Sequence, residues 1–558
     1  MSASWWRDDA VPWSADGWSL VLRGDELAEI RHHDVRLLRA VRVAIRDRGW
    51  RTVPVAVTSV DSDSHSLTLN LRHEGLGARI SSTLRVEASR GELRIRWEGV
   101  SESAFDTCRV GLVVLHPASH AGLPVVVTHS DGSTEASSFP VDISPHQPVT
   151  DIRELRIGGT VLQFDGDVFE MEDQRNWSDA SFKTYSRPLE LPYPYRIGAG
   201  EVVRQSLAIR HDGRREDAAR EAEPTIDLRP GGAFPAVGVE VSTAPSPVAP
   251  STLGSHRVVE LDLRTPTWGA ALQRAASDRL PLDVRLVTDG DAAVLEGAVR
   301  ALNVLDVLRV TAVDDVSHVS DDATVALLRA AEPAAAVMGG TRSHFTELNR
   351  EQHRIPADVD GIVLTTTPLF HSIDTEQLVE AVAIQRLLAR QSVRIAAGRP
   401  VHIGPVSLRP RFNNVATTPE PAPGGSDLAE GFGAEFTGET DRRQSAPELA
   451  AWVIASAAAL AVPGVSSLSW FETSGPRGVE GTPAEDAVAA LAALGGGELL
   501  TGDSPDGLVW AIGARHGGVD TLLAANLDRR ERTFRLGQDH DATVVSLLPG
   551  TWTRLTRR

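Results

Sequence analysis

Cysteine is almost absent from this 558-residue sequence, and so are long apolar runs. Cys108 is the only cysteine, so no disulfide can form within the chain, and a lone cysteine is most often a small buried side chain. No run of about 18 apolar residues occurs, which argues against a membrane-spanning helix. The first residues lack the basic region and apolar stretch of a signal peptide. We therefore expect a cytoplasmic protein without a membrane partner.

An excess of positive charge is also missing. The formal net charge is −19, whereas nucleic-acid binding requires a basic surface to meet the phosphates. The sequence has no cluster of His and Cys residues with metal-ligand spacing. His344 and Glu347 have an H-x-x-E spacing, which is not the H-E-x-x-H pattern of zinc sites. No G-x-S-x-G motif occurs, which disfavours a serine-hydrolase mechanism. We expect no cofactor, no metal and no nucleic-acid partner.

Lysine and tyrosine are scarce, and both are concentrated in one segment. Lys183 is the only lysine, because the chain uses arginine almost wherever it needs a cation, and the three tyrosines are Tyr185, Tyr193 and Tyr195. A single lysine where arginine is the default indicates a need for a compact ammonium donor. The polar run 172–179 cannot be buried without partners. We expect this segment to reach over the mouth of a second domain; a polar brace between domains is the alternative.

Residues 1–230 have the pattern of an antiparallel β-sandwich. Short alternating runs such as 67–72, 93–98 and 110–115 are separated by turn residues. Residues 231–254 are rich in Pro, Gly and Ser and are interpreted as a linker. The chain is too long for a single core, which fits several domains.

Strands and helices alternate over residues 255–503, which is typical of parallel βα units. Seven or eight such units over roughly 240 residues favour a TIM-type (β/α)8 barrel over an open sheet. In this count the fourth strand covers 334–340, the seventh covers 465–471, and the eighth is placed near 498–500. Residues 504–558 return to short alternating runs and are predicted to form a small C-terminal β domain.

Two glutamates follow predicted strands at the end where TIM barrels carry their active sites. Glu347 comes after the fourth predicted strand, and Glu472 ends the seventh. Retaining glycosidases of the large barrel clan keep their acid/base and nucleophile after strands four and seven, and two carboxylates facing one pocket suit acid/base hydrolysis. A solvated loop position is the alternative for Glu347. His371, Arg409 and Asn413 are further candidates at this end of the barrel.

Two segments resemble the D-apionate lactonase family of bacterial sugar catabolism. They are Phe169–Tyr185 and Trp470–Gly478. The resemblance covers the whole chain, including the order of sandwich, barrel and β tail. It implies hydrolysis of D-apionolactone, a branched aldonolactone, to D-apionate.

A lactonase needs a base that activates water and donors that hold the carbonyl oxyanion. One of Glu347 and Glu472 is predicted to deprotonate water, and Lys183, His371 or an asparagine to hold the oxyanion. The predicted substrate-binding residues are Glu172, Asp173, Asn176, Trp177, Asn349, Arg409, Asn413 and Arg477.

Two other functions stay open on the residues alone. A retaining glycosidase would use Glu347 as acid/base and Glu472 as nucleophile, with carboxyl groups about 5–5.5 Å apart. A non-catalytic carbohydrate-binding protein would lack convergent carboxylates. Only the family resemblance ranks a lactone above a glycoside, so the expected partner is a small sugar lactone or sugar.

Overall fold

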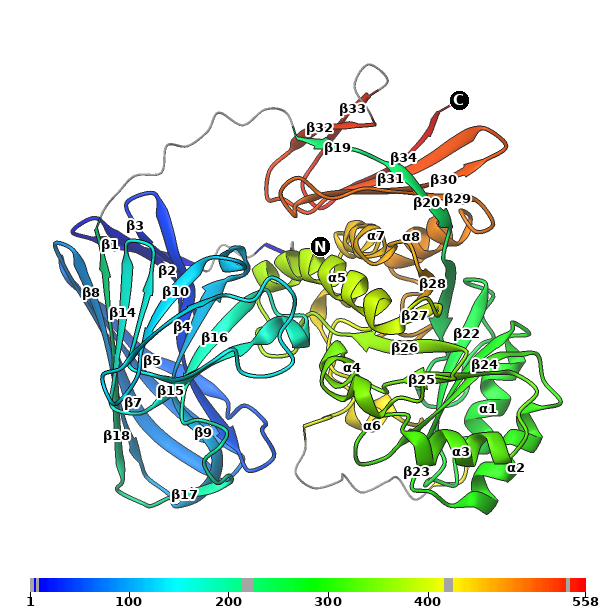
Figure 1. Ribbon diagram of the computed structural model, residues 1–558, viewed down its shortest axis with the longest axis horizontal. Coiled ribbons are helices and arrows are strands. Elements are labelled where there is room, and N and C mark those ends of the chain that lie inside the picture. Colours follow the sequence, from blue (N-terminus) through cyan, green and yellow to red (C-terminus); the bar gives the residue numbers. More distant parts are fainter. Residues whose placement is uncertain (1–4, 7–9, 213–223, 416–424, 538–541, 558) are drawn as a thin grey trace.

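The computed structural model describes residues 5–6, 10–212, 224–415, 425–537 and 542–557, in three parts. An N-terminal β-sandwich lies beside a closed barrel, and a smaller β region, formed mainly by the C-terminal strands, packs on the barrel (Figure 1). The predicted fold class, a TIM-type barrel flanked by an antiparallel sandwich and a C-terminal β region, is therefore confirmed.

The sandwich consists of two nine-stranded antiparallel sheets. Side chains of its strands alternate between buried and exposed, as in 78–89, because neighbouring residues of a strand point to opposite faces. The apolar halves of both sheets form one core. In sheet order, the first sheet contains β1 (Val11–Ala15), β2 (Trp18–Arg23), β3 (Glu26–His32), β4 (Val35–Asp47), β9 (Phe105–Pro117), β16 (Ser181–Ser186), β15 (Phe169–Asp173) and β12 (Val149–Ile152), with β17 (Tyr195–Ile197) also paired to β9. The second contains β11 (Thr134–Ser138), β10 (Pro124–Thr128), β13 (Glu154–Ile157), β14 (Thr160–Asp165), β18 (Val202–His211), β8 (Glu92–Ser101), β7 (Ala78–Ser89), β6 (Ser66–Gly75) and β5 (Val55–Ser62).

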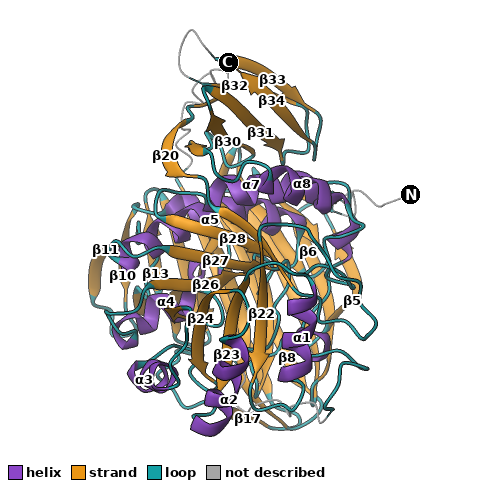
Figure 2. Cartoon of the chain, turned by 90° about the vertical axis from the view of Figure 1, so that its right-hand side faces the viewer, coloured by secondary structure: helices purple, strands orange, loops and turns teal. Residues whose placement is uncertain are grey.

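The barrel is closed by eight parallel strands with helices outside (Figure 2). The strands are β21 (Ala236–Glu240), β22 (His256–Asp262), β23 (Leu282–Thr288), β24 (Val307–Asp314), β25 (Ala336–Gly340), β26 (Gly361–Thr366), β27 (Val401–Val406) and β28 (Val465–Trp470). The helices are α1 (Trp268–Ser277), α2 (Ala292–Leu302), α3 (Asp322–Ala330), α4 (Phe345–Glu351), α5 (Thr375–Ala396), α6 (Ala434–Thr437), α7 (Leu449–Leu460) and α8 (Pro483–Ala492).

The structure corrects the predicted linker at 231–254 and the position of the eighth strand. β21 lies inside that segment, pairs with β22 and β28, and is the first strand of the barrel. Residues 498–501 form β29, which pairs outside the barrel. A five-residue strand surrounded by Pro, Gly and Ser carries too little pattern to be recognised. The count therefore shifts by one: Glu347 follows the fifth barrel strand and Glu472 the eighth, so the strand positions no longer support the glycosidase alternative.

The C-terminal β region combines strands that precede the barrel in the sequence with strands that follow it. It packs on α7, in which every residue is buried (Figure 2). A five-stranded sheet contains β20 (Arg229–Ala233), β29 (Glu498–Thr501), β30 (Val509–His516), β31 (Val519–Asn526) and β34 (Trp552–Arg557). A three-stranded sheet contains β19 (Thr225–Ile226), β32 (Arg532–Leu536) and β33 (Thr543–Leu547). The predicted domain 504–558 is thus larger than expected, because it also includes β29, just before residue 504, and β19 and β20, which precede the barrel.

The turn between β15 and β16 inserts into the barrel domain. It includes the 3-10 helix η2 (Gln174–Trp177), and every residue from Phe169 to Ser186 is buried. Ser178 Oγ lies 2.6 Å from Thr366 Oγ1 at the end of β26. Gln377 of α5 bonds two backbone groups of the turn, at 3.1 and 3.2 Å. This segment is therefore part of the contact between sandwich and barrel.

Asn349 of α4 is a second point of this contact. Its amide Nδ2 donates to Asn176 Oδ1 at 2.9 Å and to the Ile143 carbonyl at 3.0 Å, and its Oδ1 accepts from Gln391 Nε2 at 3.2 Å. All of these groups are enclosed, so each one depends on the others for hydrogen bonds.

We predict that Asn349→Ala lowers the free energy of unfolding by about 2–4 kcal/mol, because it leaves several buried polar groups without partners. Chemical denaturation followed by tryptophan fluorescence measures the change. Glu351→Ala, at the 36% exposed end of the same helix, is the control and should cost less than about 1 kcal/mol. Equal stability of the two variants would contradict the role given to Asn349.

Candidate active site

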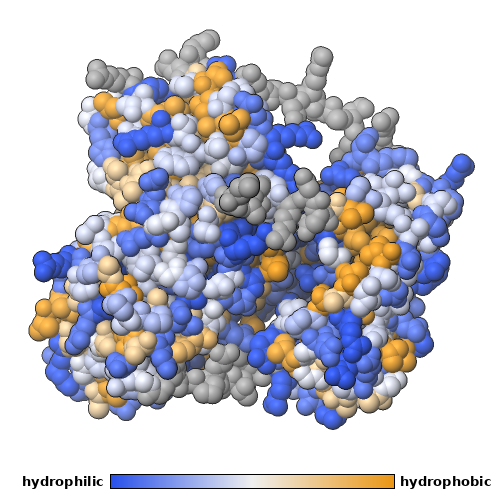
Figure 3. All heavy atoms as spheres, turned by 180° about the vertical axis from the view of Figure 1, so that it is seen from behind, coloured by the Kyte–Doolittle hydropathy of each residue, from blue (hydrophilic) through white to orange (hydrophobic). Residues whose placement is uncertain are grey.

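A pocket of about 730 Å³ lies between the sandwich and the mouth of the barrel. The surface is hollowed between these two parts (Figure 3). The sandwich contributes side chains of β4, β9, β15 and β16, and the barrel contributes the loops after β26 and β27 and helix α4. The charged and aromatic lining residues are Arg42, Arg46, Trp50, Arg51, Arg109, Glu172, Trp177, Lys183, Tyr193, Arg350, Phe370, His371, Arg409, Phe412 and Glu439.

A buried ion pair lies on the sandwich side of this pocket. Glu172 and Lys183 are direct cross-strand neighbours on β15 and β16, with 2.9 Å between Oε2 and Nζ. The other oxygen of Glu172 accepts from Trp177 Nε1 at 3.2 Å. Burial raises the pKa of Glu172, but Lys183 and Arg350 outweigh burial and hold this pKa well below its usual range. Glu172 is therefore ionised.

Lys183 has a pKa close to neutrality. Burial lowers the pKa of its amine to about 8, although the carboxylate of Glu172 acts in the opposite direction. Nearby Arg109 and Arg46 lower it further. Lys183 is thus a cation at neutral pH, and it loses its proton at a pH about two units lower than a solvated lysine does.

A histidine–aspartate pair joins the two domains. His371 follows β26 of the barrel, Asp179 follows η2 of the sandwich, and Nδ1 and Oδ2 lie 2.5 Å apart. Burial lowers the pKa of His371 despite the carboxylate of Asp179. The imidazole is therefore neutral at neutral pH: with Nδ1–H donating to Asp179, Nε2 keeps a free lone pair. This is the arrangement of a general base.

A small recess of about 20 Å³ adjoins the pocket beside this base. His371, Lys183, Arg46 and Arg109 line it together with Gln174 and other residues. Such a volume holds about one water molecule, provided that polar groups surround it. Positive neighbours favour the hydroxide form of a water and any oxyanion that develops there.

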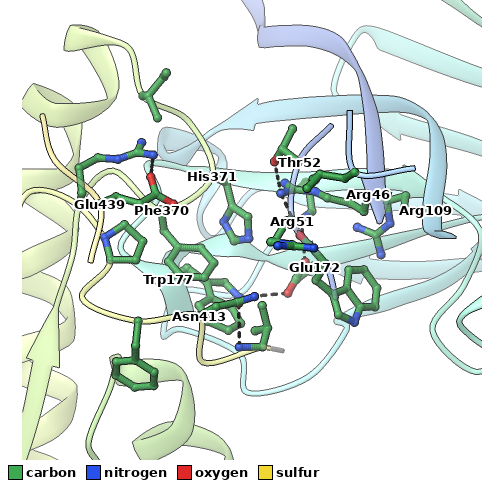
Figure 4. Close-up of a pocket in the computed structure, with 18 of the residues that line it drawn as sticks. Arg46, Arg51, Thr52, Arg109, Glu172, Trp177, Phe370, His371, Asn413 and Glu439 are labelled. Carbon is green, nitrogen blue, oxygen red and sulfur yellow. Dashed lines mark hydrogen bonds and ion pairs between the residues drawn. The ribbon is translucent and has the colours of Figure 1, made fainter. Parts of the chain in front are cut away.

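The aromatic wall of the pocket comes from both domains. Trp177 of the sandwich stacks on Phe370 of the barrel, with ring centroids 4.7 Å apart and an angle of 19° between planes. In the close-up, Phe370 and Trp177 lie on one side of His371, and Arg46, Arg51 and Arg109 lie on the other (Figure 4). The base thus stands between an apolar wall and a cationic face.

The structure brings half of the predicted site residues together. Those that line the pocket are Glu172, Trp177, Lys183, His371, Arg409 and Asn413. Those that do not line it are Glu347, Glu472, Asp173, Asn176, Asn349 and Arg477. Asp173, Asn176 and Asn349 take part in the hydrogen bonds around the inserted turn.

Glu472 is fully buried, with no exposed surface. Its Oε1 accepts from Arg477 Nε at 3.2 Å, and the backbone N–H of Thr243 donates to Oε2. Burial is the main cause that raises the pKa of this carboxyl. Both oxygens of Glu472 are engaged within the protein, away from the pocket.

Glu347 is in the first turn of α4. Its Oε1 accepts from Asn414 Nδ2 at 2.8 Å, whereas its Oε2 is enclosed without a hydrogen-bond partner among the described residues. Burial raises its pKa. Glu347 thus contacts the residue that follows the pocket residue Asn413, but it does not itself line the pocket.

Several important residues were not identified from the sequence, among them Arg46 and Arg109, which line the pocket, and Asp179, which pairs with the pocket residue His371. Asp179 ends the polar run 172–179, which was singled out from the sequence as needing partners. Its pairing with His371 was not predicted. Arg42 and Arg46 lie on the same face of the largely buried strand β4, and charged residues at even spacing in such a strand are a usable signal. Arg109 carries no comparable signal.

Within the described ranges, no group of three or more His, Cys, Asp or Glu side chains is arranged to hold a metal ion. No helix in the same ranges is both long and apolar enough to cross a membrane.

Comparison with known proteins identifies related sequences along most of the chain. Residues 3–214 match the family described as D-apionate lactonase, N-terminal domain, and residues 254–496 match D-apionate lactonase, TIM barrel domain. A D-apionate lactonase of Brucella anthropi is 30% identical over 517 residues, which cover 83% of each chain. Among solved structures, a β-arabinopyranosidase is 12% identical, with a TM-score of 0.31 and 99% of both chains covered. A GH30 endoxylanase of Clostridium papyrosolvens is 10% identical, with a TM-score of 0.38, 60% of this chain covered and 99% of its own.

We predict that Lys183 titrates near pH 8, and that Glu172→Gln lowers its pKa by about 1–2 units because a neighbouring carboxylate is lost. Since Lys183 is the only lysine, ¹³C-lysine labelling gives one side-chain resonance to follow by NMR. Glu439→Gln, in the same pocket but paired with Arg409, is the control and should leave the value unchanged. A pKa near 10.5 would show that the amine is solvated.

Proposed function

Because the chain belongs to the D-apionate lactonase family, we propose that it hydrolyses D-apionolactone to D-apionate in the pocket between sandwich and barrel. The observation that carries this proposal is the His371–Asp179 pair beside a cationic recess of one-water size. A lactone hydrolase requires a base for water and positive donors for the carbonyl oxygen, and both are present at this place.

His371 is proposed as the base in place of either glutamate. The free Nε2 removes a proton from the water, whose oxygen attacks the lactone carbonyl carbon. The carbonyl oxygen becomes an oxyanion, which Lys183 and Arg46 stabilise. Collapse of this intermediate breaks the bond to the ring oxygen, and the proton held on His371 passes to that oxygen as the new hydroxyl. The acid product then ionises to its carboxylate.

The remaining pocket residues are proposed to hold the sugar. Glu172 is ionised and can accept hydrogen bonds from hydroxyl groups, and Asn413 can both donate and accept. The stacked Trp177 and Phe370 offer an apolar face to the C–H bonds of the ring. Glu472 is assigned a structural role in this proposal, because it is fully buried and does not line the pocket.

We predict that His371→Ala lowers kcat for D-apionolactone by about 10²–10⁴, the usual contribution of a positioned base. A pH-stat assay with the non-enzymatic rate subtracted measures this loss. Added imidazole should restore part of the activity, which a purely structural defect would not allow. Near-normal turnover of the variant would remove His371 from the mechanism.

Asp179 acts on this base as a positioning residue. Asp179→Asn should lower kcat and also shift the acid limb of the rate profile to lower pH. The reason is that the Asp179 carboxylate raises the pKa of His371, so its removal lowers that pKa. Asp142→Asn, at a 63% exposed position of the sandwich, is the control and should change neither.

The pH dependence of kcat/KM is predicted to be bell-shaped. His371 must be neutral, so activity rises as pH increases through its pKa, which burial places below 6.5. Lys183 must be protonated, so activity falls as pH passes about 8. Rates measured from pH 4 to 10 test both limbs. An alkaline limb that begins only near pH 10 would exclude Lys183 as the group responsible.

A further inference from the structure

Two arginines face each other directly on the sandwich side of the pocket. Arg46 of β4 and Arg109 of β9 are opposite residues in the antiparallel register. Arg42 lies four residues before Arg46, on the same face of β4, and also lines the pocket. Like charges that oppose each other across strands are destabilising, so this arrangement needs a counter-charge.

No carboxylate among the described residues forms an ion pair with either guanidinium, although Asp179 and Glu172 act on Arg46 from a greater distance. Arg46 donates to the Trp50 carbonyl and to the Thr52 hydroxyl, both of which are uncharged. The guanidinium of Arg109 has neither a hydrogen bond to a side chain nor an ion pair among the described residues, and its Nε is enclosed without a partner. Its guanidinium is instead held by Tyr185, with Cζ 3.5 Å from the ring centre.

The other cations of the pocket differ in this respect. Arg51 pairs with Asp47 at 2.7 Å, Lys183 with Glu172 at 2.9 Å, and Arg409 with Glu439. Burial lowers the pKa of Arg46 to about 10, and the neighbouring Arg42 and Arg109 lower it further, whereas the carboxylates of Asp179 and Glu172 offset this decrease only in part. In a chain of net charge −19, two facing arginines that lack a carboxylate in direct contact are an exception that indicates an anionic ligand.

We propose that Arg46 and Arg109, with Arg42 beside them, form a carboxylate-binding subsite that holds the open-chain aldonate, so that the protein binds its product more tightly than the neutral lactone. The identity of this anion rests on the proposed function. The lactone is uncharged, whereas the oxyanion and then the carboxylate would develop at the mouth of the recess that His371, Arg46 and Arg109 line. Planar guanidinium groups match a carboxylate in a bidentate manner, which an ammonium cannot. The subsite therefore distinguishes product from substrate by charge.

Isothermal titration calorimetry with D-apionate tests the subsite without turnover. The neutral polyol of the same skeleton serves as the comparison ligand. The wild type is expected to bind D-apionate at least 10-fold more tightly than the polyol, and Arg109→Gln is expected to remove most of this difference. Arg196→Gln, which removes a 65% exposed arginine of β17 that is paired with Asp106, should bind D-apionate within about twofold of the wild type.

Thermal stability separates this role from a structural one. Arg109→Gln relieves repulsion with Arg46, so its melting temperature should stay equal or rise while D-apionate binding falls. Arg46→Gln is the second variant and should show the same loss of binding, in case Arg109→Gln does not fold. Unchanged D-apionate binding in a folded Arg109→Gln or Arg46→Gln, or equal binding of acid and polyol by the wild type, overturns the proposal. Loss of lactone hydrolysis in the assay with retained, Arg109-dependent aldonate binding would instead refute only the proposed reaction.

Discussion

The burial of one polar turn determines how this protein is built. The segment between β15 and β16 carries Asp173, Asn176 and Asp179 into a space enclosed by the sandwich and by α4 and α5. Polar groups can be buried only where each finds a partner, and the barrel supplies these partners through Gln377 and other side chains. The two domains are consequently held in one relative position, and the pocket between them depends on that position.

The same contact supplies the chemistry. Asp179 belongs to the sandwich and His371 to the barrel, so the pair exists only when the domains are docked. Glu172 and Lys183 are presented by the strands on either side of the turn, and Trp177 of the turn itself stacks on Phe370 of the barrel. The barrel mouth alone would offer a base without the carboxylate that orients it. The sandwich alone would offer cations without a base.

The fold class and the importance of segment 169–185 were predictable from the sequence, because strand–helix alternation and the concentration of rare residue types are local patterns. β21 was missed because five residues among Pro and Gly carry little periodicity. The pairing of Asp179 with His371 could not be predicted, since these residues are 192 positions apart and no spacing rule connects them. The opposition of Arg46 and Arg109 depends on the register of β4 and β9, which composition does not specify. The family resemblance indicated a lactonase, but the assignment of the base to glutamates came from a strand count that was off by one.

The single lysine acquires a physical meaning beside the arginines. Even with the pKa of Arg46 lowered to about 10, both guanidinium groups remain charged at neutral pH, so Arg46 and Arg109 provide a constant positive field there. An ammonium buried in that field has a pKa lowered toward neutrality, and Glu172 limits this decrease to a value of about 8. An arginine at position 183 would add another permanent cation and would fit its larger, planar group poorly into a recess of about 20 Å³. Lysine at this position therefore gives the site one compact cation whose charge is present at neutral pH and is set by its neighbours.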